Sequence, residues 1–369
     1  MYKALFMVVL GLAVSGIAEA RNVHFTGDFE SGQIQNKSST KDGFFVHTLP
    51  KAQPGTQSVS SPDSTFAAGT NMDTMVVTSE VVGGETVTPR KGGYFLRSAL
   101  YYDKNYAGLN DGLNKPRSKI YMSDPVHRID HDTEGFVGFS IYTPKNFESE
   151  LGIKGTAGAT MLFVINSTAS RSHVQLYQYA ASSDAEAHWY LLYHVNAKST
   201  NEDGSSIKAI DLGPVSADVG KWTDFVIRYR FNPFSTATNP AAIGIPNSVN
   251  KTYQGNKGIL QVWKSVGSVN GSGNRNLSLE VDQVNVPIGL VPHATDKLIH
   301  YWRIYKYGWH NNPTTVQGPV WYGFDEIRQG LVARDGTGFA DVNPSGLSCT
   351  VGCADVPVMP LPPTDVSIQ

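Results

Sequence analysis

Short segments in which apolar and polar residues alternate recur along the chain from residue 93 onward. Alternation over four to eight residues is typical of a half-buried β-strand, because successive side chains of a strand point to opposite faces. The pattern predicts nine strands: GYFLRSAL (93–100), EGFVGFSIYTP (134–144), GATMLFVIN (158–166), HVQLYQY (173–179), HWYLLYHV (188–195), KWTDFVIRYRF (221–231), GILQVWK (258–264), LIHYWRIYKYGWHNN (298–312) and VWYGFDEIRQG (320–330).

Loops rich in Gly, Pro, Asn and Asp separate these segments, and no amphipathic helix longer than about three turns interrupts them. Strands that follow one another without helices favour a sandwich or a jelly roll over a parallel α/β sheet. The chain has no internal repeat, which argues against a propeller or a solenoid. Residues 21–90 are turn-rich, and residues 232–257 form a polar insertion that we expect to be a loop.

Both ends of the chain differ from the strand-rich middle. Residues 1–20 contain one early lysine, a short apolar run and the small-residue ending Ala18-Glu19-Ala20, which together predict a secretory signal peptide. The apolar run is too short to span a membrane. Residues 21–355 are predicted to form one domain, and residues 356–369 a Pro-rich tail. We therefore expect a secreted protein, extracellular or periplasmic.

Composition and charge narrow the possible partners. The chain has 36 Gly, 20 Pro and 11% aromatic residues, as expected for many turns between short strands. The formal net charge of −2 gives no reason to expect nucleic acid or an anionic membrane as a partner. The two cysteines, Cys349 and Cys353, are predicted to form a local disulfide in an oxidising compartment, since cysteines without paired histidines make a poor zinc site.

The strand at 221–231 has the pattern of an ordinary sandwich strand. Its alternation places Phe225, Ile227, Tyr229 and Phe231 inward and Val226, Arg228 and Arg230 outward. The strand at 173–179 differs, because its predicted outer face carries His173, Gln175, Tyr177 and Tyr179. Such a face is either simply wet or the floor of a polar groove, where amides, imidazoles and rings would bind a sugar polymer.

The segment from Leu298 to Asn312 carries an unusual face. Read with period two, it places Tyr301, Arg303, Tyr305, Tyr307 and Trp309 together. A row of phenols and an indole around a guanidinium suits neither a plain core nor a plain solvent face. We interpret it either as an aromatic edge of the sandwich or as part of a binding site.

Acidic and histidine side chains give weaker signals. No two acids share a strand face at close spacing, which disfavours a glycosidase unless distant segments bring acids together. His127 and His131 have the spacing of metal ligands on a helix, but the segment is loop-like and has no clear third ligand. Glu30 or Asp28 with Asp325 would fit a structural calcium ion if the first and last strands lie side by side.

With these segments placed, the chain resembles the jelly-roll polysaccharide lyases, especially the group of heparin lyase I and glucuronan lyase. The resemblance covers most of the mature chain. It rests on the order of FESG (29–32), KPRSKIYM with Arg117, EGFVGFSIYTP, GKWTDFVIRYRF, GILQVWK, the Arg/Tyr strand and FDEIRQG. It implies a concanavalin A-like sandwich of two antiparallel sheets with a concave substrate groove.

The resemblance also implies roles for individual residues. In such lyases a basic residue lies four positions before the catalytic tyrosine, a spacing matched here by Arg303 and Tyr307. Arg303 would neutralise the substrate carboxylate together with Asn166 or with His173 and Gln175. The substrate-binding residues would be Arg117, Tyr177, Tyr301, Tyr305 and Trp309. The family's Arg-x-Glu pattern reads Arg117-Ser118-Lys119 here, which leaves the role of Arg117 open.

The implied activity is β-elimination on a uronic-acid polysaccharide. Tyr307 would act as the base and as the acid, and the reaction would need no cofactor. Two alternatives remain on the same fold: a carbohydrate-binding protein without activity, and a glycoside hydrolase with dispersed acids. The sequence does not choose among alginate, glucuronan, ulvan and glycosaminoglycans as the polymer.

Overall fold

The computed structural model describes residues 23, 25–32, 45–49, 72–82, 85–101, 117–122, 129–145, 159–167, 172–180, 184–195, 206–233, 257–265, 277–291, 296–306 and 319–344. Strands dominate these ranges, and no helix within them is long and apolar enough to cross a membrane. The predicted signal peptide, the Pro-rich tail, Cys349 and Cys353 lie outside the described residues.

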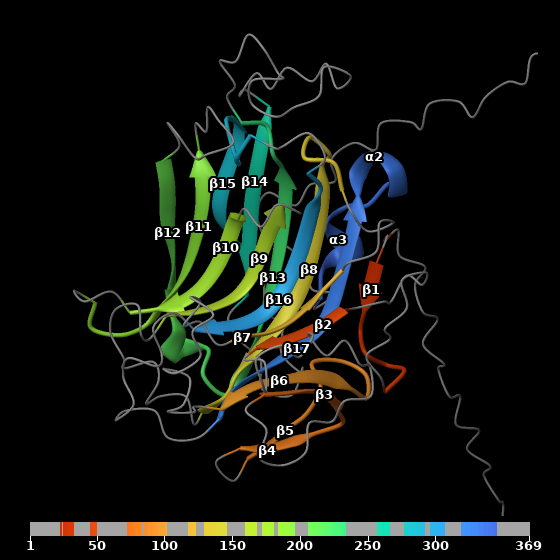
Figure 1. Ribbon diagram of the computed structural model, residues 1–369, viewed down its shortest axis with the longest axis vertical. Coiled ribbons are helices and arrows are strands. Elements are labelled where there is room, and N and C mark those ends of the chain that lie inside the picture. Colours follow the sequence, from red (N-terminus) through yellow and green to blue (C-terminus); the bar gives the residue numbers. More distant parts are fainter. Residues whose placement is uncertain are drawn as a thin grey trace, which may run out of the picture.

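One antiparallel sheet contains eight of the described strands (Figure 1). Its order is β15 (Ser278–Val286), β14 (Gly258–Lys264), β13 (Lys221–Arg230), β8 (Gly135–Thr143), β17 (Pro319–Leu331), β6 (Phe95–Tyr101) and β3 (Met72–Val77), with β1 (Phe25–Gly27) paired to β17. The pairing of β1 with β17 joins strands from the two ends of the described chain, and it confirms that the first and last strands lie side by side.

The second antiparallel sheet has seven of the described strands. Its order is β12 (Ser206–Pro214), β11 (His188–Val195), β10 (Ser172–Tyr179), β9 (Thr160–Ser167), β16 (Leu298–Lys306), β7 (Arg117–Tyr121) and β2 (Phe45–Leu49). The smaller elements are the hairpin of β4 (Glu80–Val82) and β5 (Glu85–Val87), the 3₁₀ turn η4 (Val215–Ala217), and the short helices α2 (Val332–Asp335) and α3 (Phe339–Val342).

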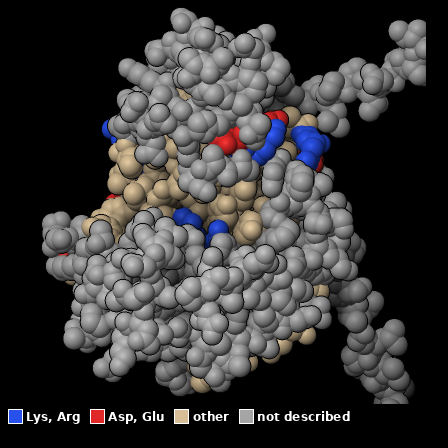
Figure 2. Space-filling model, viewed as in Figure 1, with Lys and Arg blue, Asp and Glu red and all other residues tan. Residues whose placement is uncertain are grey.

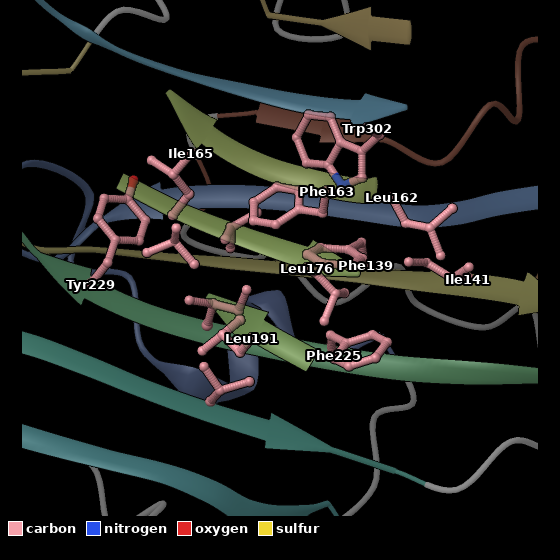
Figure 3. Close-up of a cluster of buried hydrophobic side chains, with 14 of the residues drawn as sticks. Phe139, Ile141, Leu162, Phe163, Ile165, Leu176, Leu191, Phe225, Tyr229 and Trp302 are labelled. Carbon is pink, nitrogen blue, oxygen red and sulfur yellow. The ribbon is translucent and has the colours of Figure 1, made fainter. Parts of the chain in front are cut away.

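The two sheets pack face to face as a jelly-roll β-sandwich, and the large side chains between them form the main core. Figure 3 shows Phe139 and Phe225 of the eight-stranded sheet against Phe163 and Trp302 of the seven-stranded sheet. The rings of Phe139 and Phe163 have centroids 4.6 Å apart. Complete burial of one such side chain contributes about 1.5–3 kcal/mol, so this layer is the main source of stability.

A polar link crosses the same interface. The amide nitrogen of Gln178 on β10 donates to the hydroxyl of Thr143 on β8 at 2.8 Å, and the phenol of Tyr322 on β17 donates to the amide oxygen of Gln178 at 2.5 Å. Both ends of a fully buried amide are thereby satisfied, which avoids the cost of an unpaired buried polar group. The link also fixes how the two sheets sit against each other.

All nine strands predicted from alternation are present. The predicted faces of β13 are also confirmed: Phe225, Ile227, Tyr229 and Phe231 lie in the core. Its outward arginines are paired with an acid rather than simply solvated, since Arg228 and Arg230 both donate to Glu134. The alternation pattern missed eight of the described strands, namely β1, β2, β3, β4, β5, β7, β12 and β15.

Candidate active site

Strand β16 separates core residues from polar and aromatic residues as its alternation predicted. Trp302 and Ile304 belong to the core between the sheets. Tyr301 and Tyr305 belong to a different cluster on the opposite face, and the Arg303 guanidinium lies over both of their rings, 5.8 Å and 4.8 Å from the centroids. Tyr307 and Trp309 lie beyond the described part of this segment.

Tyrosines from four strands share this outer face of the seven-stranded sheet. We call it the tyrosine face and define it by Tyr121 (β7), Tyr177 and Tyr179 (β10), Tyr190 (β11), and Tyr301 and Tyr305 (β16). Cross-strand pairing connects them, because Tyr305 and Tyr177 both lie opposite Met161 of β9, and Tyr177 lies opposite Tyr190. The face therefore runs across the strands rather than along one of them.

Figure 2 shows described side chains as a band across the middle of the molecule, with Lys and Arg near its centre. In the matching view of Figure 1 this region lies over β9, β10 and β16. Rings and cations gathered on one sheet face are suited to a sugar polymer that carries negative charge.

Neutral groups contact the side chain of Arg303. Besides the two tyrosine rings, its Nε and Nη2 atoms contact the sulfur of Met161 on β9. A thioether is a weak acceptor, and a ring face attracts a desolvated cation by about 2 kcal/mol but carries no net charge, so these contacts orient the guanidinium without neutralising it. Arg303 is 7% exposed, which restricts how a ligand approaches it.

Strand β7 adds a second cation that the sequence reasoning did not assign to the site. The register pairs Arg303 with Lys119 and Tyr305 with Arg117. Lys119 lies over the rings of Tyr301 and Tyr121, with its Nζ 4.6 Å and 5.1 Å from their centroids. The backbone of Arg117 is part of the strand, but its side chain is not described.

Strand β10 contributes an oriented amide. Val174 and Leu176 point into the core, and Tyr177 and Tyr179 pack on the tyrosine face, as predicted. The phenol of Tyr177 donates to the amide oxygen of Gln175 at 2.7 Å. Because this contact uses the oxygen, the groups that Gln175 offers to a ligand are its N–H donors, and N–H donors suit a carboxylate.

His173 does not share this face, which corrects the prediction from strict alternation. A register shift between Ser172 and Val174 interrupts the ladder with β9. The ring of His173 stacks on the core residue Phe231 with centroids 4.7 Å apart, and its Nδ1 accepts the backbone N–H of Leu290. A β-bulge adds one residue to one strand and therefore reverses the alternation locally. The structure thus separates His173 from Gln175.

Asn166 also lies away from the Arg303 end of β16. It pairs with Ile299 at the start of β16, whereas Lys306 at the other end pairs with Thr160. Four residues of strand at about 3.3 Å each separate Ile299 from Arg303 by roughly 13 Å. The Asn166 amide oxygen is buried and has no hydrogen-bond partner among the described residues. Asn166 and Arg303 are therefore not placed to hold the same carboxylate.

The far end of the tyrosine face is acidic. His188 Nδ1 lies 2.8 Å from the carboxylate of Asp211, and the phenol of Tyr190 donates to Asp184 at 3.1 Å. Burial, the hydrogen bond to Asp184 and the charge of Asp211 raise the pKa of Tyr190 to about 12. These acids come from a loop and a neighbouring strand, so no spacing rule along the sequence could have found them.

The proposed calcium ligands are occupied by backbone donors. Asp325 is fully buried and accepts the N–H groups of Arg90 and Glu326, and burial raises the pKa of its carboxyl group. Glu30 accepts the N–H of Gly93, and the Asp28 carboxylate accepts the N–H of Glu30. A carboxylate has about four lone-pair sites and can accept hydrogen bonds while it binds a cation, so these contacts do not decide the matter and the calcium site stays a prediction.

Glycine is required beside Glu30. Gly92 has a φ of +72°, and a Cβ atom there would lie 2.1 Å from the Glu30 carboxylate.

No group of three or more His, Cys, Asp or Glu side chains within the described ranges could hold a metal ion. His131 is buried against His173, and His127 is outside those ranges.

Comparison with solved structures finds several polysaccharide lyases. The chain is similar to the endo-β-1,4-glucuronan lyase from the fungus Trichoderma reesei (16% identity, 73% of this chain and 90% of that chain, TM-score 0.47). It is also similar to the PL-14 alginate lyase from Aplysia kurodai (12% identity, 64% and 82%, TM-score 0.36) and to the alginate lyase from Klebsiella pneumoniae (8% identity, 68% and 93%, TM-score 0.34). The comparison with protein-family models gave no match, and neither did the comparison with curated proteins.

Proposed function

We propose that this protein is a polysaccharide lyase that cleaves a uronic-acid polymer by β-elimination. The observation that carries the proposal is the position of the Arg303 guanidinium, which lies on the tyrosine face over the rings of Tyr301 and Tyr305. Tyr307 follows four residues later in the same segment. The alternation of β16 continued by one residue would place Tyr307 on the same face as Tyr305.

Binding would depend on the rings of the tyrosine face. Pyranose rings have apolar C–H faces that pack on aromatic side chains, and the tyrosines are spread over four strands. A polymer lying across the strands would meet several of these rings in turn. Tyr177, Tyr301, Tyr305 and Trp309 are the proposed stacking residues near the cleavage point.

The chemistry requires the substrate carboxylate to be neutralised first. The proton on C5 of a uronate is only feebly acidic while the adjacent carboxylate keeps its charge, and a guanidinium hydrogen-bonded to that carboxylate removes this obstacle. Arg303 supplies the guanidinium in the proposal. The N–H donors of Gln175, which lies in register with Tyr301 but two strands away from β16, would bind a neighbouring sugar.

Tyr307 would then move the protons. As phenolate it takes the proton from C5, the electron pair of that C–H bond forms the C4–C5 double bond, and the C4–O bond breaks. The glycosidic oxygen leaves with its electron pair and takes the proton from the Tyr307 phenol, which restores the phenolate. No cofactor takes part in these steps.

A phenol with an ordinary pKa of about 10 is a poor base at neutral pH, and a nearby positive charge lowers that pKa. The Arg303 guanidinium lies closer to the ring of Tyr305 than to that of Tyr301, so it leans toward the end of β16 that leads to Tyr307. This lean supports Arg303 as the charge that favours the phenolate of Tyr307.

Secretion through residues 1–20 and a Cys349–Cys353 disulfide belong to the same proposal.

One observation favours a second candidate, a glycoside hydrolase. Asp184 accepts the phenol of Tyr190, and Asp211 lies opposite Tyr190 on β12, so two carboxyl groups are near one tyrosine at the acidic end of the face. A hydrolase needs two carboxyl groups about 5–10 Å apart. A carbohydrate-binding protein without activity would use the same rings. The three functions differ in their products.

A panel of purified polyuronates separates them. The lyase proposal predicts a rise in ultraviolet absorbance as new C=C bonds conjugated to carboxylates form, together with new reducing ends. New reducing ends without the absorbance rise would establish a hydrolase and overturn the proposal. Binding with neither signal on any polymer of the panel would leave a carbohydrate-binding protein.

A further inference from the structure

Lys119 lies where its charge can influence which polymer binds to the tyrosine face. Lys119 on β7 lies directly opposite Arg303 on β16, and directly opposed residues of an antiparallel pair have Cβ atoms about 4.5–5.5 Å apart. Like charges at such positions repel each other. A strand pair whose only purpose was packing would not benefit from two cations there.

The two charges point apart. Both cations lie over the ring of Tyr301, but Lys119 Nζ also lies over Tyr121, whereas the Arg303 guanidinium lies closer to Tyr305 than to Tyr301. The rings of Tyr301 and Tyr121 themselves pack together with centroids 5.2 Å apart, so they form a rigid support for Lys119. Because the charges diverge, they suit two separate anionic groups better than one shared carboxylate.

The orientation of the face relates these two groups to consecutive sugars. The tyrosines lie in rows that cross the strands, so a polymer that follows them passes from one strand to the next. A step between neighbouring strands is about 4.8 Å, which is comparable to the length of one sugar unit. A sugar at Arg303 on β16 would therefore have its neighbour at Lys119 on β7.

We propose that Lys119 binds the carboxylate of the uronate next to the one bound by Arg303, so that the face selects polymers with consecutive uronates. This inference rests on the proposed lyase function and names its substrate class. A polymer in which uronates alternate with neutral sugars would place one carboxylate at Arg303 and nothing charged at Lys119.

The test compares two polymers and three variants. Lys119→Met keeps the aliphatic stem on the tyrosine rings and removes the charge, while Lys119→Arg keeps the charge. Lys208→Met, on the exposed edge strand β12, is the matched control. KM and kcat are measured by absorbance on a homopolyuronate and on a polymer of alternating uronate and neutral sugar. Binding is measured by calorimetry in the Tyr307→Phe background.

Loss of one charge-assisted hydrogen bond should raise KM on the homopolyuronate about tenfold or more in Lys119→Met. It should leave kcat and the alternating polymer within about threefold. Lys119→Arg should restore KM, and Lys208→Met should behave as wild type. Calorimetry should show the same loss of affinity.

Equal losses on both polymers, a loss confined to kcat, or no loss would overturn the role of Lys119. These outcomes are distinct from failure of the proposed function. In that case the wild-type protein itself would produce no absorbance rise on either polymer, and the calorimetric comparison would still report whether Lys119 binds a neighbouring uronate.

Discussion

The two ends of the tyrosine face carry opposite charge. At the β7 and β16 end, Lys119 and Arg303 lie over tyrosine rings. At the β11 and β12 end, the phenol of Tyr190 donates to Asp184, and Asp211 accepts from His188. Rings alone would bind any sugar, so the charges decide where the anionic part of a polymer lies. A polyuronate should therefore be held most tightly at the cationic end.

Removal of Arg303 should have the largest effect. Loss of one preorganised charge that stabilises a developing anion costs about 10²–10³ in kcat. We expect Arg303→Met to lose that much in kcat/KM on the best polyuronate, and Arg303→Lys to recover part of it. Initial rates of absorbance increase provide the measurement.

Arg230→Met is the matched control, because Arg230 lies on β13 of the eight-stranded sheet, away from the tyrosine face, and pairs with Glu134. An Arg303→Met variant as active as this control would show that the cationic end does not carry the chemistry.

The stability of the fold should decrease in acid because of His131, a residue that lies outside the tyrosine face. Burial lowers the pKa of His131 to about 4. The charge of Lys297 also lowers this pKa, whereas the charges of Asp296, Asp130 and Asp132 raise it. Its ring packs edge-on against His173, and neither ring nitrogen has a hydrogen-bond partner among the described residues.

His131 therefore becomes protonated near pH 6.5 in the unfolded chain but only near pH 4 in the folded protein. The contribution to stability is complete above about pH 6.5 and falls by about 3 kcal/mol as the pH drops toward 4. Urea unfolding should show this slope in the wild type and a flatter one in His131→Phe. Identical slopes would exclude His131 as the source.

The pKa values of the phenols at the two ends should be shifted in opposite directions. Burial and the two acids raise the pKa of Tyr190, whereas Arg303 is proposed to lower that of Tyr307. Spectrophotometric titration of wild type minus Tyr190→Phe should show one phenol ionising near pH 12. Asp184→Asn should shift that ionisation to lower pH.

The dependence of kcat on pH should not change in Tyr190→Phe, since this phenol stays protonated wherever the enzyme works. A changed profile would mean that the acidic end takes part in proton transfer.

Reversing the charge at the acidic end should have the smallest effect. Asp211→Lys places a cation at the far end of the face, where a long polyuronate would pass. An exposed charge contributes about 0.2–1 kcal/mol, so affinity for long oligomers should rise by up to about fivefold at low salt and lose this gain at high salt. Short oligomers should be unaffected, and an equal gain for them would contradict the assumed path of the polymer.

Alternation along the sequence predicted the strands and faces that depend on local pattern. The nine predicted strands are present, and Trp302, Arg303 and Tyr305 point as expected because β16 has a regular core-facing side at those residues. The turn-rich composition of residues 21–90 hid strands whose partners are distant in sequence, such as β2, which pairs with β7.

The errors in the site have one physical cause, which is register. The bulge near Ser172 turned His173 into the core, and the pairing of Asn166 with Ile299 placed it four residues along the strand from Arg303. Lys119 reaches Arg303 only because β7 pairs with β16. No pattern within one segment specifies which residues of two strands become neighbours.

The central claim is that Tyr307 removes the C5 proton beside the charge of Arg303. The most direct test measures the absorbance of unsaturated product from a homopolyuronate for wild type, Tyr307→Phe and the matched variant Tyr305→Phe, with affinity measured in parallel. The account predicts that Tyr307→Phe binds the polymer normally and forms no unsaturated product, while Tyr305→Phe remains active. Unsaturated product from Tyr307→Phe at the wild-type rate would contradict it.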